Sequence, residues 1–240
     1  MSELHNLFGE RGAGKSAFLM NVVSDIYFNR GQELLENSRR IIEEQNKKRT
    51  KKLTPPSKVP IYCINFKCKI PNPDGSIYEP FYLEGSELGI GKKYKKIYPG
   101  AVIIIDEAQN ELNSKSDLKR EVSAFFEKSR HADFEIWIAS QRPILINKDI
   151  RDLSHHFIQI CKLEMDVAQF DIICGLKWYC REFNSRADVD EYADLPKSEQ
   201  DANVNYRETV YTGAGEITEY YDSKGLLEEY LPAEGEDYEK

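Results

Sequence analysis

The sequence has no long hydrophobic run. Its longest wholly apolar stretch, Ala101–Ile105, has five residues, whereas a membrane-spanning helix needs about 20. The first residues are polar and show none of the features of a secretory signal peptide. We therefore expect a cytoplasmic protein with no transmembrane segment of its own.

Paired cysteines are also missing. The chain has five cysteines, an odd number, and no two of them have C-x-x-C spacing. This pattern fits neither a disulfide framework nor a zinc ribbon. We expect reduced and mostly buried thiols, without a metal or redox role.

Basic charge is scarce overall and unevenly distributed. The net charge is −8, but residues 187–240 hold 16 acidic and 4 basic residues, a balance of −12. Residues 1–186 hold 29 basic and 25 acidic residues, a balance of +4. The length of 240 residues suits one domain plus an appendage. We predict a domain over 1–186 and an acidic appendage over 187–240, and a charge balance that neither requires nor forbids nucleic acid.

The sequence does contain a phosphate-binding pattern at its start, G-x-x-x-x-G-K-S over residues 9–16. Glycines let backbone N–H groups converge on a phosphate, and the helix that follows directs its positive end to the same anion. Lys15 would meet the β- and γ-phosphates, and the Ser16 hydroxyl would bind Mg²⁺. Apolar residues on both sides of the pattern argue against a chance glycine-rich turn. The residues expected to contact ATP are Gly9, Glu10, Arg11, Gly12, Ala13, Gly14, Lys15, Ser16 and Ala17.

A second motif follows about ninety residues later. The apolar run Ala101–Ile105 is typical of a strand buried on both faces of a parallel sheet, and it ends in Asp106 and Glu107. Asp106 would hold Mg²⁺ beside Ser16, and Glu107 would polarise the attacking water. The adjacent acids favour an ATPase with a catalytic glutamate over a GTPase. Gln141, which ends the next strand, could sense the γ-phosphate and orient the water.

Strands and helices alternate along the chain, which predicts an α/β fold. The expectation is a P-loop NTPase with a mostly parallel sheet flanked by helices and a small acidic β-hairpin appendage at the C-terminus. Asn29-Arg30-Gly31 is predicted to end the first helix, and residues 212–216 are predicted to form the hairpin turn. We expect helices near 16–28, 34–42 and 117–130, strands near 61–66, 101–105, 134–139 and 157–161, and a disordered tail after 232.

Two basic stretches leave alternatives open. Residues 39–58 contain eight basic and two acidic side chains, and residues 92–96 read K-K-Y-K-K. The first stretch is either a solvated helix end with a flexible loop or an arm that contacts nucleic-acid phosphates. The second is interpreted as a surface turn.

Four further segments occur in a specific order after the P-loop: V-I-I-I-D-E-A-Q (102–109), F-E-K-S-R-H (126–131), I-A-S-Q (138–141) and the Asp149-Ile150-Arg151 pattern within 146–156. Together they resemble the Zot-type (zonular occludens toxin-like) ATPase domain of filamentous-phage assembly proteins, which are relatives of the FtsK/HerA DNA-pumping ATPases. The resemblance covers roughly residues 4–163. It implies an inner-membrane-associated ATPase that drives phage DNA through assembly and export.

The resemblance also adds expectations about assembly. The family's Arg-His pair corresponds to Arg130-His131, and in a ring such an arginine can complete the neighbouring subunit's site; a helix-terminal arginine favoured by the helix dipole is the alternative. Phage members continue into a membrane-spanning helix, which is absent here. Attachment to the inner face of the host membrane would therefore need a membrane-anchored partner protein.

The leading hypothesis is an ATP-hydrolysing, Mg²⁺-dependent motor for phage virion assembly, export or DNA translocation, working as a homo-oligomeric ring. One alternative is a DNA-packaging or conjugation-type ATPase of another mobile element. The other is an ATP-gated binding module with little turnover, which the presence of Glu107 disfavours.

Overall fold

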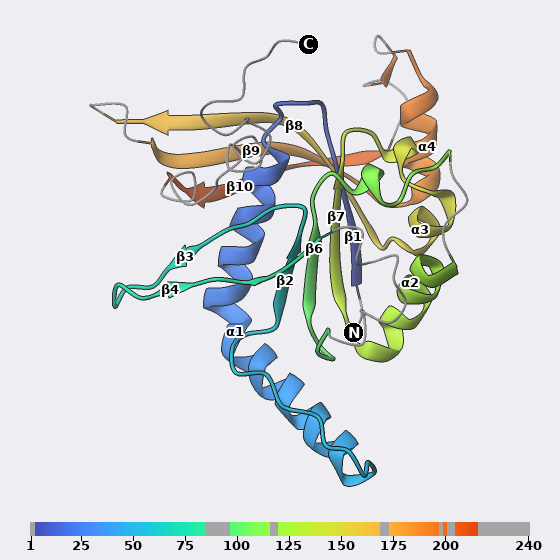
Figure 1. Ribbon diagram of the computed structural model, residues 1–240. Helices are drawn as coiled ribbons and strands as arrows, with labels where there is room; N and C mark the ends of the chain where they lie inside the picture. Colours follow the sequence, from blue (N-terminus) through green and yellow to red (C-terminus); the bar gives the residue numbers. More distant parts are fainter. Residues whose placement is uncertain are drawn as a thin grey trace, which may run out of the picture.

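The computed structural model describes residues 3–84, 97–115, 120–168, 173–196, 199–200 and 205–215. Eight strands form one sheet in the order β10-β9-β8-β1-β7-β6-β2-β5 (Figure 1). Their bounds are β1 (Glu3–Phe8), β2 (Ile61–Ile64), β5 (Phe81–Leu83), β6 (Val102–Ile105), β7 (Glu135–Ser140), β8 (His156–Val167), β9 (Ile173–Phe183) and β10 (Tyr206–Ala214). The short strands β3 (Ile70–Pro71) and β4 (Ile77–Tyr78) form a separate antiparallel pair.

The central part of the sheet is parallel. β1 pairs in parallel with β7 and β8, β6 with β7 and β2, and β2 with β5. In this sheet the antiparallel pairs among the described strands are β8 with β9 and β9 with β10. The predicted α/β fold with a mostly parallel sheet is therefore confirmed. Since β7 lies between β1 and β6, the carboxyl ends of these three strands meet at one edge of the sheet.

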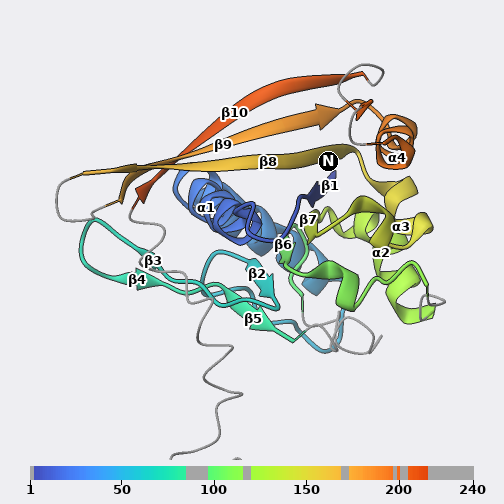
Figure 2. The same cartoon turned by 90° about the horizontal axis from the view of Figure 1, so that it is seen from above.

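Helices cover both faces of the sheet. The α-helices are α1 (Lys15–Lys47), α2 (Arg120–Ala132), α3 (Lys148–Leu153) and α4 (Arg186–Asp194), and two short 3₁₀ helices are η3 (Ala108–Asn110) and η4 (Pro143–Leu145). Viewed from above, α1 lies between the β8–β10 part of the sheet and the β2–β5 part, while α2 and α3 lie apart from it (Figure 2). The sheet thus curls around α1.

Three apolar clusters hold these layers together. The first joins α1 to β2, β8 and β9, and contains Phe18, Leu19 and Trp178. The second joins α2 and α3 to the other face of β6 and β7. A smaller third cluster packs α4 against Phe8, Phe157 and Phe183. All four residues of β6 are fully buried, as the run of isoleucines predicts.

The predicted break in the first helix is wrong. Asn29-Arg30-Gly31 lies inside α1, a single helix of 33 residues that is about 50 Å long. Gly31 is buried there, and a Cβ on it would lie 3.3 Å from Val59 Cγ2. The glycine therefore allows the segment before β2 to pack closely against the helix. This packing explains why a residue that usually weakens helices does not end this one.

The C-terminal half of the sheet is longer than the sequence indicates. The strand predicted at 157–161 extends to Val167 and forms a long antiparallel pair with β9, which was not predicted. β10 then pairs with β9 over nine residues, Tyr206–Ala214. Gly213 and Ala214 therefore continue an edge strand of the main sheet, where a hairpin turn was predicted. The second half of that hairpin, from residue 216, lies outside the described residues.

β10 lies beyond the predicted domain boundary at 186/187 but continues the same sheet. α4, which begins at this boundary, is also tied to the preceding part of the chain. Arg151 in α3 forms an ion pair with Asp190 in α4, and Arg186 pairs with both Asp152 and Asp190. The division into two domains stays a prediction.

The first basic stretch, 39–58, comprises the end of α1 and a segment that folds back along it. Arg39 donates to the carbonyl of Pro56, and the Asn46 side chain bonds both N–H and C=O of Leu53. The second stretch, 92–96, and the tail after 232 lie outside the described residues. In the part of the chain that is described, no helix is long and apolar enough to cross a membrane. None of the five cysteines, all of which lie within the described residues, forms a disulfide; three are buried, and Cys161 and Cys174 are exposed.

Candidate functional site: a P-loop facing two acidic residues

The P-loop connects β1 to α1. β1 ends at Phe8 and α1 begins at Lys15, so the loop spans Gly9–Gly14. Gly12 and Gly14 have φ angles of +83° and +88°, a left-handed conformation that favours glycine. Gly9 is required for a different reason, because a Cβ there would lie 2.6 Å from the carbonyl oxygen of Ile160. The backbone geometry of the loop therefore explains why glycine occupies all three positions.

The first turn of α1 is suited to bind an anion. It contains no acidic residue, and no side chain caps its N-terminus. The N–H groups of this turn have no partner within the helix, and the helix dipole places partial positive charge beside them. A phosphate group would satisfy both.

Lys15 points back into this loop. Its Nζ donates to the carbonyls of Gly9 at 3.0 Å and Glu10 at 3.2 Å, and the residue is buried. Burial lowers the pKa of Lys15, while nearby Glu107 and Asp106 act in the opposite direction. The loop therefore holds a positive charge at its centre, where a phosphate could replace the two carbonyls.

The two sequence motifs meet at Ser16 and Asp106. Ser16 Oγ donates to Asp106 Oδ2 at 2.5 Å. Asp106 Oδ1 accepts the backbone N–H of Glu107 at 2.8 Å, and Asn65 donates to the Asp106 carbonyl. Burial raises the pKa of Asp106, and the hydrogen bond from Ser16 opposes this. A hydroxyl and a carboxylate in contact are oxygen ligands of the kind that Mg²⁺ prefers, so the pair fits that ion.

Glu107 has an unusual backbone conformation. Its φ of +46° and ψ of +41° place it in the left-handed region, which non-glycine residues rarely adopt. Its Oε2 accepts a hydrogen bond from the side-chain amide of Gln109. Strain of this kind is concentrated at functional sites. The strained turn directs the chain from β6 into η3 and sets the direction of the Glu107 carboxylate.

Sequence reasoning missed the role of Gln109. Its amide holds the Glu107 carboxylate, while its own Oε1 is buried with no hydrogen-bond partner among the described residues. The residue belongs to the D-E-A-Q segment that carried the family resemblance. The sequence signal that could have identified Gln109 is its position two residues after Glu107.

Gln141 and Arg130 lie at different ends of the sheet. Gln141 is exposed and directly follows Ser140, which pairs with Phe8 at the start of the P-loop. Arg130 is near the end of α2, which leads into the amino end of β7. The P-loop is at the carboxyl end, so Arg130 is remote from the site of its own subunit. The predicted roles of both residues stay predictions.

Residues of β8 and β9 pack against the P-loop. Sequence reasoning did not predict this contact. The fully buried Trp178 donates from Nε1 to the carbonyl of Gly14 at 3.2 Å. A Cβ on Gly14 would lie 2.7 Å from Leu163 Cδ2. The antiparallel strands thus contact the P-loop directly. No motif identified them, because their contribution is shape and one indole N–H.

Comparison with known proteins agrees with this architecture. A search of curated protein sequences gave no match to the chain. Among solved structures, the fold is similar to the N-terminal domain of zonular occludens toxin from Neisseria meningitidis, with 18% identity and a TM-score of 0.56, covering 92% of this chain and 100% of that one.

A weaker similarity is to the genome packaging NTPase B204 from Sulfolobus turreted icosahedral virus 2, with 10% identity and a TM-score of 0.44, covering 88% of this chain and 96% of that one. Of these two structures, only the zonular occludens toxin domain supports the fold assignment, and at 18% identity it supports nothing beyond the fold. The family itself is identified by sequence, because the family model of zonular occludens toxin (Zot) matches residues 8–169, from the P-loop to the end of β8. The chain therefore belongs to the Zot family.

Proposed function

We propose that this chain is a Mg²⁺-dependent ATPase that acts as a motor in phage virion assembly, export or DNA translocation. The observation that carries the proposal is the 2.5 Å contact between Ser16 and Asp106. It joins the phosphate loop to the acidic end of β6 and sets Glu107 beside them. Membership of the Zot family supports the link to phage.

Each residue at the site has a distinct role in the proposed reaction. The N–H groups of the P-loop and the ammonium of Lys15 bind the β- and γ-phosphates. Ser16 and Asp106 would hold Mg²⁺, which would supply positive charge to neutralise the phosphates. Glu107 accepts the proton of the attacking water, and Gln141 orients that water from the end of the neighbouring strand.

Release of Glu107 by the Gln109 amide would make the carboxylate a more effective base toward water. In the structure the carboxylate oxygen Oε2 is engaged by this amide. The contact restrains the base until nucleotide, DNA or a neighbouring subunit rearranges η3. It is also the observation that favours the alternative function, an ATP-gated binding module with little turnover.

The motor would work as a ring. Since the end of α2 that carries Arg130 lies at the opposite end of the sheet from the P-loop, a catalytic role for this arginine would be in the site of an adjacent subunit. Mixing an Arg130→Ala protein with a Lys15→Ala protein tests this, because a mixed interface can combine an intact P-loop with an intact arginine. Recovery of ATPase activity supports the role in trans; a verified mixed oligomer without recovery contradicts it.

The decisive experiment measures ATPase rate with and without single- and double-stranded DNA. A motor has measurable basal turnover that DNA accelerates, and a switch has negligible turnover under every condition. Gln109→Leu sharpens the comparison, since removing the amide frees Glu107 and should raise the basal rate. If ATP binds but turnover stays negligible with DNA and in Gln109→Leu, the motor is rejected in favour of the switch.

The family resemblance supports the proposal of a DNA substrate and a membrane partner. The basic residues at the end of α1 and in the segment that returns from it offer phosphate contacts, among them the exposed Arg40 and Lys52. We propose that a membrane-anchored protein holds the ring at the inner face of the host membrane. Recovery of the chain with membranes only when phage membrane proteins are co-expressed would support this attachment.

A further inference from the structure

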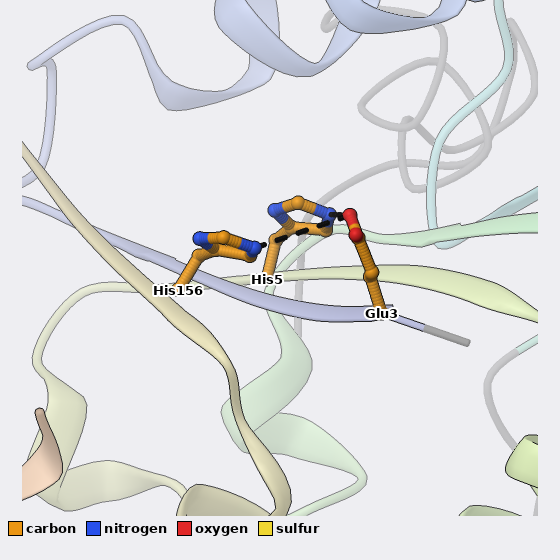
Figure 3. Close-up of side chains that lie close together, drawn as sticks. All are labelled: Glu3, His5 and His156. Atoms are coloured by element: carbon orange, nitrogen blue, oxygen red, sulfur yellow. Dashed lines mark ion pairs between the residues drawn. The ribbon is translucent and has the colours of Figure 1, made fainter. Parts of the chain in front are cut away.

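Three metal-ligating side chains meet at the amino end of β1 (Figure 3). Glu3 and His5 are two residues apart on one strand, so both project from the same face of the sheet. His156 begins β8 and pairs in register with His5. The topology therefore gathers a carboxylate and two imidazoles, although 151 residues separate the two histidines along the chain.

The donor atoms are close to one another. Glu3 Oε2 lies 3.4 Å from His5 Nε2 and 3.9 Å from His156 Nε2. One potential ligand atom from each residue lies within 4.8 Å of the others. Two donors bound to one tetrahedral zinc ion at about 2.0–2.2 Å are separated by about 3.3 Å. The first distance already matches this value, and the others need only small side-chain movements.

His5 provides an independent observation. It is 8% exposed, and its Nε2 is buried without a hydrogen-bond partner among the described residues. The ring is fixed by stacking on Trp137, with centroids 3.9 Å apart, and the Trp137 indole is itself held by Glu135. A buried nitrogen that makes no hydrogen bond costs free energy, and a metal ion shared with Glu3, whose Oε2 lies 3.4 Å away, would satisfy it.

We propose that Glu3, His5 and His156 form a binding site for a divalent transition metal ion, with zinc favoured by two imidazoles and one carboxylate. Three protein ligands leave a fourth position, which water can fill because Glu3 and His156 are exposed. The bound ion would fasten the start of β1 to the start of β8. The site is at the opposite end of β1 from the P-loop, so the inference is independent of the ATPase proposal.

Binding requires one movement. The His5 and His156 rings are nearly parallel, with 13° between their planes and 4.6 Å between centroids. Lone pairs lie in the ring planes, so in this arrangement they do not converge on one point. His5 is fixed, but the exposed His156 ring can rotate and direct its Nε2 to an ion held by Glu3 and His5. Metal therefore replaces the stacking of the two imidazoles.

The test is a calorimetric titration of Zn²⁺ into chelator-treated, dialysed protein without nucleotide. We expect one equivalent to bind at micromolar concentration or tighter. His156→Ala and Glu3→Gln should each weaken binding at least 10-fold; both residues are exposed, so neither variant endangers folding. His131→Ala is the matched control, because His131 is exposed on α2 over the other face of the sheet. Asp106→Asn should also bind normally, which excludes the P-loop site.

Cobalt(II) provides a second readout. Co²⁺ at this site should give visible ligand-field absorption without the near-ultraviolet band of a thiolate–cobalt bond, which separates it from binding by Cys161 or Cys174. Absence of binding below millimolar Zn²⁺, or unchanged affinity in His156→Ala and Glu3→Gln, overturns the proposal. The three residues would then be a metal-free aromatic stack with an adjacent carboxylate.

Discussion

The indole Nε1 of Trp178 donates a hydrogen bond to the backbone carbonyl of Gly14, with 3.2 Å between the two atoms. This bond joins β9, far along the chain, to the residue that precedes the P-loop lysine. Phe18 in the first turns of α1 packs edge-on against the same indole, at 5.5 Å between centroids. The position of the phosphate loop therefore depends on the antiparallel end of the sheet.

Trp178→Phe should weaken ATP binding about 2- to 10-fold, the effect of losing one hydrogen bond of about 0.5–1.5 kcal/mol. Phenylalanine retains most of the ring but cannot donate to Gly14. Trp137→Phe is the control, because the Trp137 indole bonds Glu135 at the other end of the sheet. The chain has two tryptophans, so the control variant keeps Trp178 as its single tryptophan. If the fluorescence emission of Trp178 in this control variant does not change at saturating ATP, the coupling between Trp178 and the P-loop is contradicted.

Glu107→Gln should reduce ATP turnover by at least about 100-fold while preserving ATP binding, because general base catalysis contributes about 10²–10⁴. Lys15→Ala should instead abolish binding, since the ammonium meets the phosphates before and during reaction. The two variants are compared by equilibrium nucleotide binding and by single-turnover hydrolysis. Wild-type turnover in Glu107→Gln would remove Glu107 from the catalytic assignment.

Sequence patterns predicted the two motifs that the fold brings together at Ser16 and Asp106, because each motif is local. Glycine conformation, the Lys-Ser pair and an apolar strand ending in two acids each have a chemical reason that is visible in a short window. The 2.5 Å approach of Ser16 to Asp106 follows from placing both motifs at the carboxyl ends of strands in one parallel sheet.

Features that depend on contacts between residues far apart in the sequence could not be predicted from short windows. Gly31 resembles a helix end, and only the packing of Val59 against it explains the continuous α1. Gly213 resembles a turn, but it allows β10 to pass Trp178, whose Cζ3 would lie 2.9 Å from a Cβ there. The polar His5 in β1 is explained by stacking between Trp137 and His156. Nothing in the structure explains the fully buried Asn6 beside it.

His5 should make the protein sensitive to acid. Burial, then the charges of His156, His155 and Arg30, lower the pKa of His5 from 6.5 to about 3. Between pH 6.5 and 3 the unfolded chain therefore binds a proton that the folded protein does not, so stability falls as pH decreases through this window. The contribution lost between pH 7 and pH 5 is about 2 kcal/mol.

His5→Phe, which keeps a ring to stack on Trp137, should show a smaller loss of stability over this range. Urea unfolding at pH 7 and pH 5, in the presence of EDTA, measures the difference between variant and wild type. The carboxylates of Glu3 and Glu135 are present in both proteins, so only the difference between variant and wild type reports His5. Equal losses in the two proteins would show that His5 is not the source of the sensitivity.

Removing residues 187–240 should destabilise the protein, because the cut deletes α4 and β10. β10 covers the edge of β9, and its Tyr211 packs edge-on against Phe18 at 5.1 Å between centroids. We expect the melting temperature to fall by at least about 5 °C, since each kcal/mol shifts it by about 2–4 °C in a chain of this size. An unchanged melting temperature would show that α4 and β10 contribute nothing to the stability of the remaining sheet.

A cut after Gly215 tests a separate idea, competition between the acidic C-terminus and DNA for basic residues. Residues 216–240 contain nine acidic and two basic side chains, so this cut removes most of the negative charge and leaves β10 in place. Lysines and arginines between residues 39 and 58 would then be free to contact phosphates. Counterion release gives a slope of about −0.9 per phosphate neutralised on B-DNA, so freeing two or three such side chains is measurable in a salt titration. We expect tighter DNA binding and a steeper salt dependence than in the full chain. Unchanged affinity and slope in a truncated protein with the melting temperature of the full chain would exclude competition by the tail.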